Sequence, residues 1–159
     1  MLASQKIEDI IKTKIQSHLT ENNISGISFI TCWEKTEDGI PKGEETSTEE
    51  ETSTGIVTIK TNLPTFETPT IPDCSFEVTL GFVSRTDADY TGKDYLTVTE
   101  LIWDIVHGWQ KSFSTVETDF TFDGFVPTGF QITASDHGLD KTNDVWPVSL
   151  NMLVFGIYQ

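Results

Sequence analysis

The sequence predicts an α+β domain in which a mainly antiparallel sheet is packed by two amphipathic helices. Apolar residues recur at helical spacing in two segments, one near the N-terminus and one between residues 97 and 111. Most of the other segments alternate between apolar and polar residues, as strands do. The length of 159 residues suits a single domain spanning 1–159 with a proper core.

The chain opens with an amphipathic helix, whose apolar face is formed by Ile7, Ile10, Ile11, Ile15 and Leu19. Ser4 is the expected N-cap, and Asn22 and Asn23 followed by Gly26 predict the end of the helix. Residues 27–33 (ISFITCW) are apolar and β-branched or aromatic, so we expect a strand that is buried on both faces.

Residues 34–54 form an acidic, threonine-rich segment with almost no apolar content. Such a segment buries too little surface to offset the entropy of ordering, so we expect a flexible arm. It is either a solvated insertion between strands, or an arm that orders against a neighbouring subunit or projects where negative charge is useful. The candidate assembly residues of this arm are Glu44, Glu45, Glu49, Glu50 and Glu51.

The central segment predicts two strands and the second helix. A strand is expected at residues 55–63, followed by an extended, proline-containing connection at residues 64–72. The next strand turns one face inward with Phe76, Val78, Leu80 and Phe82. Thr97 and Glu100 have the spacing of a capping box at the start of the helix. The helix then presents a wide apolar stripe to the sheet: Val98, Leu101, Ile102, Ile105, Val106 and Trp109.

The remainder is expected to be β structure. Residues 116–123 alternate between apolar or threonine positions and acidic or threonine positions, which predicts a half-buried strand. Asp123 and Gly124 form a two-residue hairpin signal that leads into a return strand through Phe130 and Ile132. The closing strand is expected to have one apolar face, which is formed by Trp146, Val148, Leu150, Met152 and Val154.

The charge balance bears on possible partners. The chain has 25 Asp and Glu against 10 Lys and Arg, a formal net charge of −15. Phosphate backbones are bound by clustered Lys and Arg, and no such cluster occurs, so neither tight nucleic-acid binding nor membrane binding is expected. We find no secretory signal and no apolar run near the roughly 20 residues that span a bilayer. Cys32 and Cys74 are therefore expected to be reduced.

One cluster has the composition of a metal or acid–base site: Asp136, His137, Asp140 and Asp144. Its spacing matches no ligand motif, and turns select Asp, Gly and Asn, so a solvated hairpin loop is expected instead. His107 is expected to be a boundary residue beside the helical stripe, and His18 to favour the negative end of the first helix dipole. With no nucleophile elbow or phosphate loop, we expect no catalytic residue, cofactor or metal.

In their order, these segments resemble the tail terminator, or tail-completion, proteins of long-tailed bacteriophages. The resemblance is one of layout and spans nearly the whole chain. It comprises the N-terminal helix, the strand ISFITCW, the β excursion at residues 55–63, the strand FEVTLGFVS, the helix TVTELIWDIVHGWQ and closing strands that end in WPVSLNMLVFGIY. The acidic segment at residues 34–54 is longer and more charged than that pattern requires.

The resemblance implies a virion structural protein without catalytic activity. It would form a ring, commonly a hexamer, that caps the completed tail tube and mediates head–tail joining. Its partners would be further copies of the chain, the tail tube protein and a head–tail connector protein. The protein would be made in the host cytoplasm and reside in the tail or neck of the virion. Edge strands as apolar as ISFITCW and SLNMLVFGIY would be hidden by pairing between subunits, and a repeated heterologous contact closes a ring.

Acidic side chains that face the lumen of such a ring would repel DNA phosphates. The polar face of the strand predicted at residues 116–123 supplies the candidates Glu117, Asp119 and Asp123. Two other classes stay open. One is another neck or tail-tube component, such as a head–tail connector. The other is an independent module that binds a host surface through the aromatic residues near Trp146 and Tyr158.

Overall fold

The computed structural model describes residues 2–33, 54–68 and 71–158. These residues form two helices, two short 3-10 helices and a six-stranded sheet, which confirms the α+β class. The elements in chain order are α1 (Ala3–Glu21), β1 (Ile27–Thr31), β2 (Gly55–Thr61), β3 (Thr65–Thr68), β4 (Ile71–Arg85), α2 (Tyr95–Lys111), η3 (Phe113–Thr115), η4 (Glu117–Phe120), β5 (Phe125–His137) and β6 (Val145–Tyr158).

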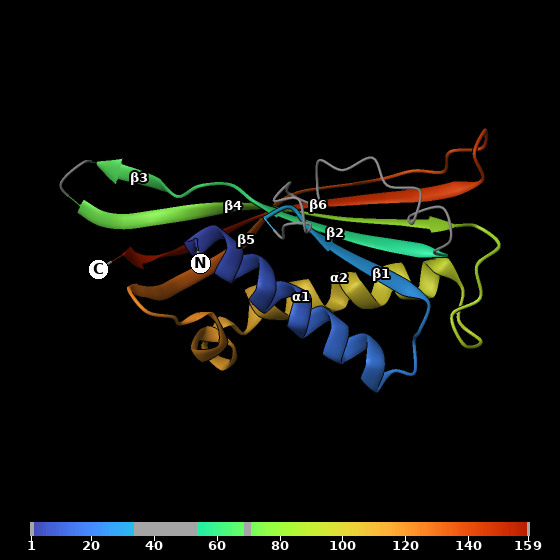
Figure 1. The fold of residues 1–159 in the computed structure, drawn as a ribbon, viewed down its shortest axis with the longest axis horizontal. Coiled ribbons are helices and arrows are strands. Elements are labelled where there is room, and N and C mark those ends of the chain that lie inside the picture. The colour runs from blue at the N-terminus through green and yellow to red at the C-terminus, as the bar shows by residue number, and fades with distance from the viewer. Residues whose placement is uncertain (1, 34–53, 69–70, 159) are drawn as a thin grey trace, which may run out of the picture.

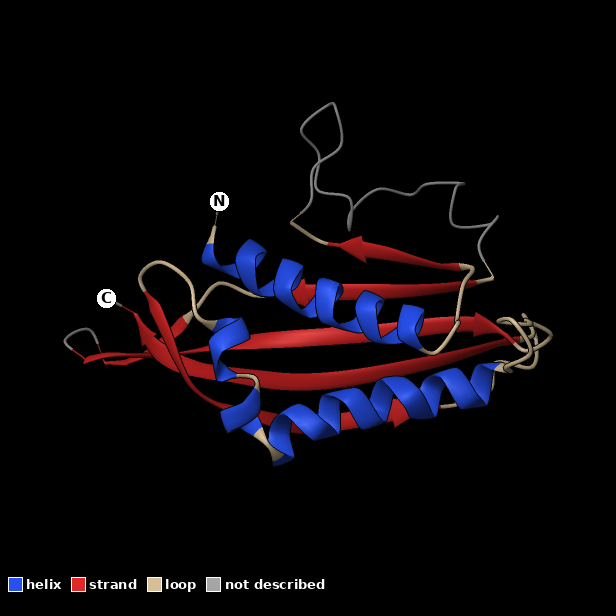
Figure 2. Cartoon of the chain, turned by 90° about the horizontal axis from the view of Figure 1, so that it is seen from below, coloured by secondary structure: helices blue, strands red, loops and turns tan. Residues whose placement is uncertain are grey.

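The sheet has the strand order β1-β2-β4-β6-β5, and β3 also pairs with β4. Only the β1–β2 pair is parallel, so the sheet is mainly antiparallel as expected. Both helices cover the same face of the sheet (Figures 1 and 2). No element in the described part of the chain covers the other face. The β3–β4 hairpin projects beyond the helical layer at one end (Figure 1).

Strands β4 and β6 form the longest pair of the sheet. Their register runs without a break from Asp73 opposite Ile157 to Arg85 opposite Val145. The inward side chains of both strands are buried against the apolar stripes of the helices, as the alternation and helical spacing predict. Gly156 lies in this row because a Cβ at that position would lie 2.3 Å from the ring of Phe125.

The prediction of a strand at residues 116–123 is wrong, since η4 occupies Glu117–Phe120 and η3 precedes it. The physical reason is aromatic packing. The ring of Phe120 is fully buried against the rings of Trp109 and Phe130, at centroid distances of 5.9 and 6.2 Å. Tight turns bring Phe120 beneath the end of α2. The turn at Gly124 is where the sequence predicts it, because Phe122 and Phe125 exchange backbone hydrogen bonds of 2.9 and 3.3 Å.

Both predicted helix caps are wrong in position. Leu2 is the N-cap of α1, and Ser4 lies inside the helix, where its hydroxyl donates to the carbonyl oxygen of Asn62 at 2.8 Å. Asp94 is the N-cap of α2, and its Oδ1 accepts hydrogen bonds from the backbone N–H and the hydroxyl of Thr97. Thr97 is therefore a donor to the cap and not the cap itself. Asn22 does end α1, as expected.

Two strand predictions also change. The strand β1 was expected to be buried on both faces, but it is a half-buried edge strand in which only Thr31 is fully buried. The segment SLNMLVFGIY was expected at an edge, but it belongs to β6, between β4 and β5. The edges of the main strand order are therefore β1 and β5. Residues 64–72 are more than a connection, because β3 pairs with the first part of β4.

Glu8 of α1 is fully buried and holds the ends of two strands. Its Oε1 accepts hydrogen bonds from the backbone N–H of Cys32 and Thr61, both at 3.2 Å, and its Oε2 accepts one from Trp33 at 3.1 Å. Burial raises the pKa of Glu8 from 4.5 to about 7, against the opposing effect of these three donors. One helical side chain therefore ties α1 to the place where the chain leaves β1.

We predict that Glu8 makes stability fall as the pH rises. The unfolded chain ionises Glu8 near pH 4.5, whereas the folded protein keeps the proton until about pH 7. Ionisation therefore favours the unfolded chain between these values. The cost should grow by about 2 kcal/mol between roughly pH 5.5 and roughly pH 8.

Glu8→Gln cannot ionise and should lack this component. Urea unfolding of both proteins at the two pH values measures it. A wild-type minus variant difference in unfolding free energy that does not change with pH would contradict the prediction.

Candidate interaction surface

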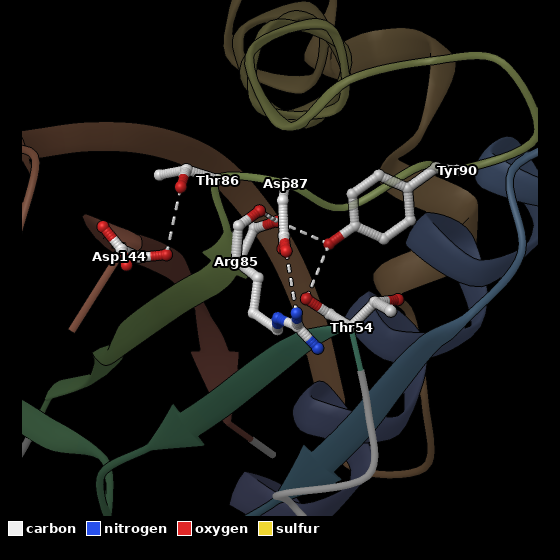
Figure 3. A network of polar contacts seen from close by, with 7 residues as sticks. Thr54, Arg85, Thr86, Asp87, Tyr90 and Asp144 are labelled. Atoms are coloured by element: carbon white, nitrogen blue, oxygen red, sulfur yellow. Dashed lines mark hydrogen bonds and ion pairs between the residues drawn. The ribbon is translucent and has the colours of Figure 1, made fainter.

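The end of the sheet opposite the β3–β4 hairpin is fixed by a polar network around Tyr90 (Figure 3). The hydroxyl of Tyr90, a fully buried residue, donates to the carbonyl oxygen of Thr54 at 3.0 Å and lies 2.5 Å from the hydroxyl of Ser84. The hydroxyl of Thr86 donates to the carbonyl oxygen of Asp144 at 3.2 Å. The starts of β2 and β6 and the end of β4 are thus joined. This network fixes the loop that leads into α2.

A pocket of about 320 Å³ opens between the first half of α2 and the ends of β5 and β6. Its walls are mainly apolar and its rim is polar. From α2 come Leu96 and Trp103, which are 48% and 37% exposed. The strands supply the remaining apolar wall, formed by Phe82, Trp146, Val148 and Leu150. We call this hollow the α2–β5 pocket.

Trp146 lies between two aromatic neighbours. Its ring centroid is 5.8 Å from that of Tyr95 on α2 and 5.2 Å from that of His137 on β5. Its indole Nε1 is buried and has no hydrogen-bond partner among the described residues. A buried polar group without a partner costs about 1–3 kcal/mol, and native proteins contain few of them. The described residues therefore leave one buried donor of this corner without a hydrogen bond.

The neighbouring edge of β5 is partly blocked and partly open. β5 pairs with β6 on one side and with no other strand in the described part of the chain. The side chain of Gln110 on α2 covers this edge at Ile132, whose backbone N–H donates to Oε1 of Gln110 at 2.6 Å. Beyond that point, residues 133–137 are all exposed. The open part of the edge adjoins the α2–β5 pocket, because Asp136 and His137 also line it.

Two acidic side chains belong to the lining of the pocket, beside the imidazole of His137. Glu100 comes from α2 and Asp136 from β5, and both are exposed. A larger hollow of about 680 Å³ lies between the two helices, but its lining carries both signs of charge. Lys14 forms an ion pair there with Asp119 at 2.6 Å and lies over the ring of Trp109. The α2–β5 pocket is the better candidate because it combines apolar walls with charge of one sign.

The four side chains singled out from composition at residues 136–144 are not gathered into one group of ligands. Within the described residues no group of three or more His, Cys, Asp or Glu side chains could hold an ion. Asp136 and His137 belong to β5, and Asp144 precedes β6. Asp140 accepts hydrogen bonds from Thr142 and Asn143, which lower its pKa. The turn chemistry expected from the sequence therefore accounts for Asp140.

The other candidate residues lie apart from the pocket. His107 is exposed on α2 and stacks on Trp103 at a centroid distance of 5.8 Å, so it lies outside the buried stripe. His18 lies in the last turn of α1. The arm candidates Glu44, Glu45, Glu49, Glu50 and Glu51 lie outside the described residues. Cys32 and Cys74 are thiols, and burial raises the pKa of Cys74.

The three candidate lumen acids are exposed near the other end of the sheet. Glu117 and Asp119 belong to η4, and Asp123 lies in the turn before β5. The strand face from which they were inferred does not exist, so they are grouped by a short helix and a turn. Whether they face a lumen stays a prediction.

Sequence reasoning missed the pocket because its walls come from distant segments. Trp103 lies outside the helical stripe that was read as core, and its exposure on an amphipathic helix is the signal that could have identified it. Trp146 and Tyr158, which were considered together as possible binding aromatics, lie at opposite ends of β6. They cannot form one compact site.

Comparison with known proteins gives one informative result. No protein-family model matches the sequence, and no curated protein matches it significantly. Among solved structures, a chain in a structure described as "Virion of native gene transfer agent (GTA) particle" has the same fold, with a TM-score of 0.50. The match covers 94% of this chain and 93% of that chain at 6% sequence identity. None of the described helices is long and apolar enough to cross a membrane.

We predict that Trp146→Phe leaves the free energy of unfolding within about 1 kcal/mol of wild type. The substitution removes the unpaired buried N–H, and this gain offsets the lost ring volume. Trp109→Phe is the control, because Trp109 is 5% exposed and packs edge-on against Phe120 and Phe130. It should lose more than Trp146→Phe in the same urea titration. A loss from Trp146→Phe as large as that from Trp109→Phe would contradict the prediction.

Proposed function

We propose that this chain is a structural protein of a phage-type virion and, within it, a tail terminator. It would form a ring on the end of the tail tube and mediate head–tail joining. The observation that carries the proposal is the shared fold over nearly the full length of this chain and of a chain from a gene transfer agent virion. The order of elements along the sequence, which resembles that of tail terminators, supports the finer assignment.

The surface of the sheet also supports a role in assembly. One face of the sheet is uncovered by any described element, and β5 pairs with a strand on one side only within the described residues. Apolar side chains are exposed on this molecule, including Phe66 at 46%, Val83 at 41% and Val126 at 43%. Open edges and exposed apolar residues are features that subunit contacts cover. A heterologous contact repeated around a closing rotation would make the ring.

The proposed partners are further copies of the chain, the tail tube protein and a head–tail connector protein. The proposed role requires interfaces and no catalytic residue. A second function from a different class, a module that binds another protein through a pocket, is favoured by the α2–β5 pocket with its exposed Trp103. The two functions can be separated by oligomeric state.

We predict that the purified protein forms a closed ring of about six subunits at high concentration. Native mass spectrometry should give a single dominant oligomer, and electron microscopy should show a ring with a central opening. Added to assembling tail tubes, the protein should also stop their growth at one end. A stable monomer under these conditions would contradict the terminator proposal and favour the binding module. A ring that does not stop tube growth would favour another neck component.

We further predict that Glu117, Asp119 and Asp123 line the opening of that ring. Acidic side chains there would repel DNA phosphates and let the genome pass. A cryo-EM reconstruction of the ring places the three side chains directly. If they lie on its outer wall, the lumen proposal is wrong, although the ring itself would stand.

A further inference from the structure

The open edge of β5 and the α2–β5 pocket together form a continuous groove. Gln110 occupies the edge at Ile132, and a strand that adds beyond this point lies alongside residues 133–137. Those residues adjoin the pocket through Asp136 and His137. An extended chain paired with this part of the edge would place alternate side chains toward the pocket, because side chains of a strand alternate in direction.

We propose that this groove binds an extended segment of a partner protein that carries an apolar residue between basic residues. The segment adds to β5 as a strand, and its apolar side chain enters the α2–β5 pocket. Backbone pairing with a sheet edge supplies affinity and the pocket supplies specificity, a recognised mode of peptide binding. The inference rests on this groove alone and holds whether or not the chain caps a tail tube.

Charge decides the class of partner. Glu100 and Asp136 line the groove, and the whole chain has a formal net charge of −15. A basic segment is attracted both by the two local carboxylates and by the field of the protein. A second copy of this chain is a poor occupant. Its projecting hairpin, β3 with the start of β4, carries Glu67 and Asp73 and would bring like charges together.

The pocket has room for one side chain of the bound segment and for part of the residues on either side of it. Its volume of about 320 Å³ is near the lower end of the roughly 300–1,000 Å³ typical of ligand pockets. A leucine-sized or aromatic side chain would contact the exposed ring of Trp103 and the branched end of the Leu96 side chain. The occupant would therefore cover two of the exposed large apolar side chains of this protein.

The test uses a synthetic peptide as the probe. It has a central leucine flanked by lysines, with threonine and valine at the other positions. Mapping of ¹H–¹⁵N chemical shifts on the full chain should show changes at the amides of residues 133–137 and at the indole N–H of Trp103 and Trp146. A peptide in which glutamates replace the lysines should cause no such changes.

Variants locate the contact. Trp103→Ala removes one wall of the pocket and should weaken binding by roughly tenfold. Asp136→Lys should weaken it by roughly fivefold, as loss of a charge pair does. Glu117→Lys is the matched control, because it makes the same change in net charge at an exposed acid on η4, away from the groove, and should weaken binding less than Asp136→Lys. Trp103 and Asp136 are exposed, so these variants should fold.

Three results would overturn the proposal. One is the absence of any shift change with the lysine peptide at millimolar concentration. Another is a set of shift changes centred on the uncovered face of the sheet or on the hollow between the helices. The third is equal binding of the lysine and glutamate peptides, or an equal loss of affinity in Asp136→Lys and Glu117→Lys.

Discussion

The unbroken pairing of β4 with β6 is the constraint on which the rest of the molecule depends. The register runs from Asp73 opposite Ile157 to Arg85 opposite Val145. This pair sets the length of the sheet and divides its side chains into two rows. The inward row packs against α1 and α2, and β2 and β5 join the pair on either side. The projecting hairpin lies at one end of this pair, and the α2–β5 pocket lies at the other end.

A sheet covered by helices on one face keeps several surfaces available for contact. The outward row of β4 and β6 mixes polar residues such as Thr79 and Asn151 with apolar ones such as Val83 and Leu153. The helical side is closed by specific contacts, notably the buried carboxyl group of Glu8 at the ends of β1 and β2. Stability is therefore concentrated in one layer of contacts, and interaction surfaces remain at the edges and on the open face.

The fold was predictable where local spacing is enough. The stripes of α1 and α2 and the alternation in β4 and β6 all follow from periodicity. The failures have one cause, which is that tertiary packing decided between local alternatives. Phe120 is buried beneath α2, so a segment that alternates like a strand forms 3-10 helices. Strand order is not encoded locally either, so β6 was placed at an edge. The pocket joins α2 to β5 and β6, and no local pattern could reveal Trp103 beside Trp146.

Hydrogen exchange of the free chain and of the assembled particle most directly tests the claim that function lies at the edges of a fixed scaffold. The account predicts added protection in residues 133–137 of β5 and at the exposed apolar residues. It also predicts that the amides of residues 76–84 in β4 and of residues 146–154 in β6 exchange slowly, at the same rate in the free chain and in the particle. Added protection throughout β4 and β6, with none at the edges, would contradict it, because assembly would then be remodelling the core.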